Sequence, residues 1–226
     1  MNRLDTRRAI AAEALGTALL LAIVVGSGIM GQRLSGGDDA IALLANAIAT
    51  GAGLVVLITI FAPVSGAHFN PLVTLALAAR RAIAPLTAAG FMVAQFAGAV
   101  AGVIAAHAMF GLPLLQVSAR LRDAPGQGVS EAIAAFGLLL TILGVSAARP
   151  AAVPAAVGLY VTAAYWFTAS TAFANPAVTV ARSLTDTFSG ISPASIPAFV
   201  AAQAAGALAA VATAGWLFAL PRSQPD

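Results

Sequence analysis

Residues 65–74 read SGAHFNPLVT, and residues 170–179 read STAFANPAVT. Both stretches place Asn-Pro in the middle of apolar surroundings, where it favours a turn and the start of a helix. Proline costs nothing at the first helical position, because its missing N–H would have no partner there. The sequence therefore predicts two short helices, about 70–82 and 175–186, which start at Asn70 and Asn175.

The segments around these two stretches are long and apolar. The chain has 226 residues, of which 60% are hydrophobic and 8% are charged, whereas soluble domains carry roughly 25% charged residues. A membrane-spanning helix needs roughly 20 apolar residues. Candidate spans are 9–30, 40–62, 87–110, 129–148, 151–169 and 194–219. We interpret the first as a retained helix and not a signal peptide. The prediction is an all-α membrane protein with six transmembrane helices and two re-entrant half-helices.

Composition also excludes several chemistries. The net charge of +3 comes from arginines scattered along the chain, with no lysine, which indicates membrane topology and not nucleic-acid binding. There is no cysteine, and the two histidines are far apart, so neither a metal site nor a cofactor is expected. The spans carry no catalytic pair of the Ser/His or Asp/Asp type. We therefore expect a protein that is not an enzyme.

The arginines divide unevenly between the two sides of the membrane. With six crossings, one side holds both termini and Arg3, Arg7, Arg8, Arg80, Arg81, Arg149 and Arg222. The other side holds Arg33, Arg120, Arg122 and Arg182, diluted by Asp38, Asp39, Asp123 and Asp186. Because cytoplasmic loops are enriched in arginine, we expect both termini in the cytoplasm.

The chain also repeats itself. EALGTALLL at 13–21 resembles EAIAAFGLLL at 131–140, and AQFAGAVAGV at 94–103 matches AQAAGALAAV at 202–211. Together with the Asn-Pro stretches, the matches occur in the same order in each half. We expect a first repeat at 1–112, a linker loop at 113–128 and a second repeat at 129–226. Three crossings per half, an odd number, make the second repeat inverted in the membrane.

Two inverted half-helices predict a transport site. Broken helices meet near the midplane in inverted-repeat proteins, and each half-helix would point its positive dipole end at the meeting point. Asn70 and Asn175 would then offer amide donors there. This arrangement suits water, a polyol or a metalloid hydroxide and repels cations. A transporter coupled to ions or protons stays an alternative, although such a protein needs an ionisable residue at the membrane midplane.

The paired boxes Asn70-Pro71-Leu72 and Asn175-Pro176-Ala177 resemble those of the major intrinsic protein family, the aquaporins and glycerol facilitators. The similarity covers the whole chain and includes Glu13, Glu131 and the AQ-x-x-G motifs at Gln95 and Gln203. The resemblance implies an hourglass pore in each protomer, a homotetramer in the lipid membrane and passive conduction. It also leads us to interpret the two glutamates as anchors for the re-entrant loops.

The sequence departs from the family pattern in two places. Leu72 replaces a small residue in the first box, which predicts a modest shift in how the half-helix docks. Val178 stands where family members usually carry a filter arginine, while Arg182 lies one turn later, about 6 Å along the axis. Whether Arg182 reaches the pore is left open.

Offsets from the two boxes carry the selectivity filter over to Thr50, Ala163, Ala172 and Val178. None of these residues is charged or aromatic, so we expect a wide, weakly polar filter. It should admit glycerol or neutral metalloid species such as arsenicals, with a strict water channel as the alternative. His68 is a possible pore residue, with pH gating as one option. His107 is expected at an interface or in contact with another protomer. Tyr165 is expected in an interfacial belt and in packing, with the border of the outer vestibule as the alternative.

Overall fold

The computed structural model describes residues 3–218, so Arg222 lies outside the described part of the chain. Eight α-helices occur within that range, and no strand does. The six long helices are α1 (Arg3–Leu34), α2 (Asp39–Ser65), α4 (Pro85–Met109), α5 (Pro125–Ala148), α6 (Val153–Phe167) and α8 (Ile196–Leu217). The two short ones are α3 (Pro71–Ala79) and α7 (Pro176–Ala181). Three 3₁₀ turns, Pro150–Ala152, Arg182–Leu184 and Pro193–Ser195, adjoin α6, α7 and α8.

Six helices in the described range are long and apolar enough to cross a membrane, as the sequence predicts. Large apolar side chains cover their outer faces, including Leu86, Leu208 and Trp216. Such a surface suits contact with lipid, since monomeric soluble proteins rarely expose large apolar patches. The prediction of an all-α membrane protein with six transmembrane helices is confirmed.

Two boundaries differ from the expectation. Helix α5 begins at Pro125, four residues before the predicted start at 129. A proline at the first helical position allows this early start, because no N–H is lost there. Helix α7 ends at Ala181 and tightens into the turn Arg182–Leu184, so it is shorter than the predicted 175–186.

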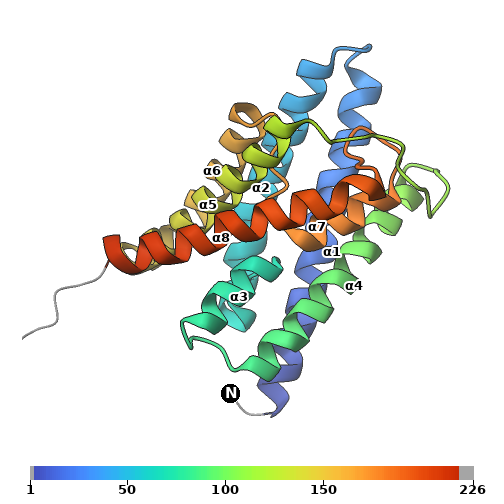
Figure 1. Cartoon of the computed structure of the whole chain (residues 1–226). Helices are drawn as coiled ribbons and strands as arrows, with labels where there is room; N and C mark the ends of the chain where they lie inside the picture. Colours follow the sequence, from blue (N-terminus) through green and yellow to red (C-terminus); the bar gives the residue numbers. More distant parts are fainter. Residues whose placement is uncertain (1–2, 219–226) are drawn as a thin grey trace, which may run out of the picture.

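The long helices pack in matching pairs, α1 on α4 and α5 on α8 (Figure 1). Glycines allow the close approach. A Cβ atom added at Gly98 would lie 2.2 Å from the Ala14 carbonyl oxygen, and one at Gly206 would lie 2.0 Å from the Ala132 carbonyl oxygen. Small residues let helix backbones meet in this way inside a membrane. The helices α3 and α7 contact each other among these long helices.

Candidate functional site

Each half-helix is capped by the asparagine of its own box. Asn70 is extended, and its Oδ1 accepts a hydrogen bond from the Leu72 N–H at 2.9 Å. Asn175 is also extended, and its Oδ1 accepts from Ala177 at 3.0 Å and from Val178 at 3.3 Å. Asparagine is a preferred N-cap because its oxygen satisfies these otherwise unpaired donors. Since the oxygen faces the helix, the amide nitrogen faces away from it.

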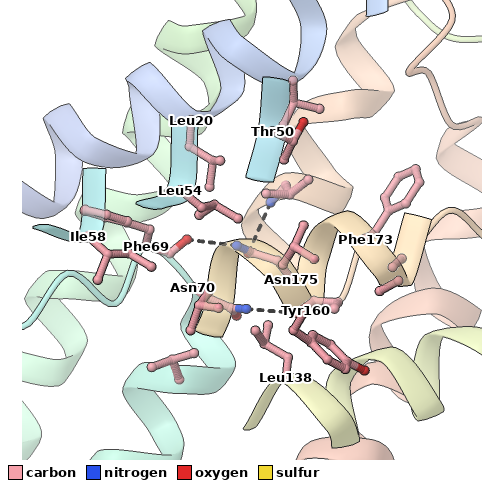
Figure 2. A pocket seen from close by; sticks show the side chains of 18 of the residues that line it. Leu20, Thr50, Leu54, Ile58, Phe69, Asn70, Leu138, Tyr160, Phe173 and Asn175 are labelled. Carbon is pink, nitrogen blue, oxygen red and sulfur yellow. Dashed lines mark hydrogen bonds between the residues drawn. The ribbon is translucent and has the colours of Figure 1, made fainter. Parts of the chain in front are cut away.

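Those amide nitrogens join the two half-helices. Asn70 Nδ2 donates to the Ala174 carbonyl at 2.8 Å, and Asn175 Nδ2 donates to the Phe69 carbonyl at 2.8 Å. Figure 2 shows both bonds as dashed lines, with the two asparagines facing the same space. Each amide nitrogen carries two hydrogens, so one N–H per asparagine is not used by these bonds. The N-termini of α3 and α7 therefore meet with two donors left at their junction.

The backbone before each asparagine is strained in the same way. The residues one and three positions before each asparagine have φ between +48° and +52°: Ala67, Phe69, Ala172 and Ala174. Non-glycine residues rarely adopt this left-handed conformation, which costs roughly 1–3 kcal/mol each when a surrounding structure holds it. The strain turns the Phe69 and Ala174 carbonyls toward the opposite asparagine.

Glu13 on α1 holds the first strained loop. Its side chain is fully buried. Its Oε1 accepts from Ser65 Oγ at 2.6 Å and from the His68 N–H at 2.9 Å. Its Oε2 accepts from the Phe69 N–H at 2.7 Å and from Gln95 Nε2 at 2.8 Å. Four donors therefore surround one carboxylate, which satisfies a group that would be costly to bury alone.

Glu131 on α5 holds the second strained loop in the same way as Glu13 holds the first. Its carboxylate is fully buried and accepts from the Phe173 N–H at 2.9 Å and from the Ala174 N–H at 2.8 Å. Gln203 Nε2 donates to it at 2.6 Å and also to Thr179 Oγ1 at 2.9 Å. The two halves of the chain thus use the same hydrogen-bond pattern at equivalent positions.

A cavity of about 80 Å³ runs beside the junction. Asn70 and Asn175 line it together with apolar side chains from α1, α2, α5 and α6, among them Leu20, Leu54 and Leu138 (Figure 2). A buried water needs roughly 10–15 Å³ of such space, so the cavity has room for several water molecules. A few polar groups among mostly apolar lining side chains are typical of a site for a small solute.

Three of the four predicted filter residues line this cavity, namely Thr50, Ala172 and Val178. The fourth, Ala163, does not. It is exposed on the outer face of α6, and its neighbour Ala164 lines the cavity instead. One residue on an α-helix is about 100° of rotation, so an offset that is wrong by one turns the side chain away. The prediction for Ala163 is wrong.

Two lining residues change the chemistry expected of the filter. Tyr165 and Arg182 are both buried and both line the cavity, and the Tyr165 hydroxyl lies 3.3 Å from Thr50 Oγ1. The cavity lining therefore contains an aromatic and a charged group, which the four predicted filter residues lack. The displaced position of Arg182 in the sequence was a signal for this residue, and its side chain reaches the cavity from one turn beyond Val178.

The remaining candidate residues are placed as follows. His68 lines the cavity, with Nδ1 3.0 Å from Thr74 Oγ1. Leu72 is buried and packs in the apolar core. His107 is fully buried, with Nδ1 2.9 Å from the Leu114 carbonyl and Nε2 2.8 Å from Thr185 Oγ1, so its expected place at an interface is wrong. It joins the segment after α4 to the segment after α7, because its two ring nitrogens have partners at Leu114 and Thr185.

Comparisons with known proteins agree with this geometry. A family model described as Major intrinsic protein matches residues 1–168. The chain is 56% identical over 217 residues to Aquaglyceroporin AqpS of Rhizobium meliloti (strain 1021), covering 96% of this chain and 93% of that protein. It is 33% identical over 171 residues to Aquaporin TIP2-1 of Arabidopsis thaliana, covering 71% of this chain and 68% of that protein. The X-ray structure of the aquaglyceroporin from Plasmodium falciparum has the same fold, with a TM-score of 0.71 at 20% identity, covering 95% of this chain and 97% of that one.

Proposed function

The chain belongs to the major intrinsic protein family, whose members are channels and not enzymes, and we propose that it conducts water and small uncharged solutes of about the size of glycerol. The observation that carries the proposal is the pair of crossed bonds from Asn70 and Asn175, which leaves one free N–H on each amide beside the cavity. A passing oxygen accepts from these donors in turn. No energy source is needed, so flow follows the gradient.

The walls of the cavity suit a polyol. The asparagine amides and the Phe69 and Ala174 carbonyls belong to a polar wall, while Leu20, Leu54 and Leu138 supply an apolar one. A solute with hydroxyls along one edge and carbon along the other satisfies both walls at once. The name of the 56% identical relative, an aquaglyceroporin, supports the same class of solute. Neutral metalloid hydroxides, arsenicals among them, have a similar size and similar hydroxyl groups, and we include them.

The pore offers little for an ion-coupled transporter. Such a transporter needs an ionisable carboxylate that faces the solute path. Neither Glu13 nor Glu131 lines the cavity. Both carboxylates accept hydrogen bonds from loop N–H groups and from a glutamine. Arg182 in the lining repels cations. These observations favour a channel over a coupled transporter.

The proposal also covers the two repeats, the anchors of their loops and the orientation of the chain in the membrane. We propose that residues 1–112 and 129–226 are inverted repeats joined by the linker, with Glu13 and Glu131 anchoring the two loops and both termini in the cytoplasm. The matched bonding of the two glutamates supports the repeats. Resemblance to the family supports a homotetramer in a bacterial plasma membrane, with one pore per protomer.

Stopped-flow light scattering on proteoliposomes tests the function. Vesicles that contain the folded protein should pass water and glycerol at least several-fold faster than protein-free vesicles, and an uncoupler should not change either rate. A strict water channel would pass water and not glycerol. If both permeabilities equal those of empty vesicles, with correct folding shown by circular dichroism, the proposal is wrong.

A further inference from the structure

The segment between α4 and α5, residues 110–124, lies across the segment that follows α7. The Ser118 N–H donates to the Ser183 carbonyl at 2.9 Å, and the Ser192 N–H donates to the Arg120 carbonyl at 2.7 Å. The Arg122 N–H donates to Ser195 Oγ at 3.0 Å. We call residues 110–124 the strap. These bonds fix the strap at the end of the cavity where Arg182 lies.

The strap brings a second guanidinium to that end. Arg122 is 7% exposed, and its Nε and Nη1 donate to the carbonyls of Gly190 at 3.0 Å and Ser170 at 3.1 Å. Its Cζ lies 5.0 Å from the centroid of the Phe173 ring. Burial lowers the pKa of Arg122 to about 10, which still leaves the side chain charged near neutral pH. Arg122 is therefore a buried cation held by backbone oxygens.

Arg182 lies over the same aromatic ring. Its side chain is 2% exposed, its Nε donates to the Ser189 carbonyl, and its Cζ is 3.4 Å from the Phe173 centroid. Both Arg182 and Phe173 line the cavity. Both guanidiniums therefore lie around one aromatic ring.

Neither guanidinium is hydrogen-bonded to a carboxylate within the described part of the chain, although Glu131 lies near enough for its charge to favour both. Every hydrogen bond that the structure gives the two guanidiniums ends on a backbone carbonyl, and none ends on a carboxylate. Both Nη atoms of Arg182 and Nη2 of Arg122 keep their donors free. Two like charges repel each other, and burying each one is costly without a partner. A bound anion would remove both costs and accept the free donors.

We propose that Arg122, Arg182 and Phe173 form a binding site for a small monovalent oxyanion where the strap meets the Arg182 end of the cavity. Guanidinium groups match the oxygens of such an ion with paired, charge-assisted hydrogen bonds. The Phe173 ring holds both groups in place and offers no competing acceptor oxygen. That the site faces the solute path rests on the proposed function.

Isothermal titration calorimetry with sodium nitrate tests the site on the full chain in an uncharged detergent. Nitrate is small, monovalent and never protonated at neutral pH, and the absence of lipid phosphate excludes headgroup binding. Urea, a neutral molecule of similar planar shape, is the matched ligand. We expect saturable heat with nitrate and none with urea. Arg122→Gln and Arg182→Gln should each weaken nitrate binding by about tenfold or more, as the loss of one charge-assisted contact implies.

Arg120→Gln is the matched control variant. Arg120 is on the same strap, lies over Phe188 at 5.6 Å and donates to the Phe188 carbonyl at 3.0 Å, but it is not part of the proposed site. Its nitrate affinity should fall by less than that of Arg122→Gln or Arg182→Gln, because Arg120 acts on the site through its charge alone and supplies no donor to the ion. If Arg182→Gln does not fold, Arg122→Gln carries the test, because its side chain is on the strap and does not line the cavity.

A second measurement places the bound ion. In vesicles of phosphatidylcholine, nitrate added at constant ionic strength with gluconate should lower the water permeability of the wild type and of Arg120→Gln, and have little effect on Arg122→Gln. No heat with nitrate, or equal affinity in all variants, overturns the proposal. Normal water and glycerol permeability in that case would leave the channel function intact, so the two failures are distinguishable.

Discussion

At the scale of single residues, Asn70 and Asn175 each do two things with one side chain. The oxygen caps a half-helix, and the nitrogen donates to the opposite loop while keeping one N–H for a solute. The cap fixes the orientation of the amide, so the donor cannot rotate away from the cavity. Aspartate would keep the cap and lose the donor.

Val178 lines the cavity, and its side chain can be replaced by a larger one or by a smaller one. It is 6% exposed and lies near Arg182 in the cavity lining. Val178→Arg should narrow the cavity and lower glycerol permeability by a larger factor than water permeability, because the larger solute meets the constriction first. Val178→Ala should raise glycerol permeability. Stopped-flow light scattering on both variants measures the two ratios, and proportional changes in water and glycerol would contradict the assignment.

The sequence predicts the capping asparagines and the buried glutamates, because an Asn-Pro pair and a carboxylate inside an apolar helix each have few satisfactory environments. It offers Tyr165 only a place at the border of the vestibule and not one beside Thr50, and it does not predict the exposed position of Ala163. Those depend on the rotation of α6, which follows from packing against α2 and α5. An error of one residue in a helix turns a side chain by about 100°. The reach of the Arg182 side chain depends on the carbonyl of Ser189, seven residues further along the chain.

At the scale of elements, the crossing of α1 and α4 depends on the absence of side chains. Gly98 and Gly102 belong to the GAVAG run, and a Cβ at Gly102 would lie 2.2 Å from the Ala18 carbonyl oxygen. The spacing of four puts both glycines on one face of α4. The run therefore indicates a helix contact from the sequence, but not which helix is the partner.

Gly98→Ala tests this crossing. Alanine favours an isolated helix over glycine by roughly 1 kcal/mol, yet here its methyl would meet the Ala14 carbonyl at 2.2 Å. We expect the protein to lose about 1–3 kcal/mol from overpacking, seen as a lower melting temperature in detergent. Gly215→Ala is the control, since nothing lies within 4 Å of its added Cβ and its melting temperature should stay equal or rise. Equal stability of the two variants would show that α1 and α4 are not tightly packed at Gly98.

At the scale of the whole molecule, the two halves repeat one plan. Each half has a long helix bearing the glutamate, a half-helix capped by asparagine and a last helix bearing the glutamine. The odd number of crossings per half supports the proposal that the second repeat is inverted, and the crossed asparagine bonds join the N-termini of the two half-helices. This plan follows from the sequence because its three motifs recur in order.

The absence of cysteine from the chain makes the topology easy to test. Asp39→Cys lies at the exposed start of α2, and Ala82→Cys lies in the exposed loop between α3 and α4. A membrane-impermeant maleimide should label the first in intact cells and the second only after permeabilisation, because arginine-rich loops stay in the cytoplasm. The reverse labelling would contradict cytoplasmic termini.

The central claim is that solutes cross through the cavity beside the two asparagines. Thr50→Cys places a thiol in the lining of that cavity, and methyl methanethiosulfonate is a small, uncharged reagent that adds one S-methyl group. The measurement is glycerol permeability of proteoliposomes before and after modification, with Asp39→Cys as a control outside the cavity. We predict that modification of Thr50→Cys removes most of the glycerol flux, that a reductant restores it, and that the control is unaffected. Unchanged glycerol flux with complete modification of Thr50→Cys, shown by mass spectrometry, would contradict the claim.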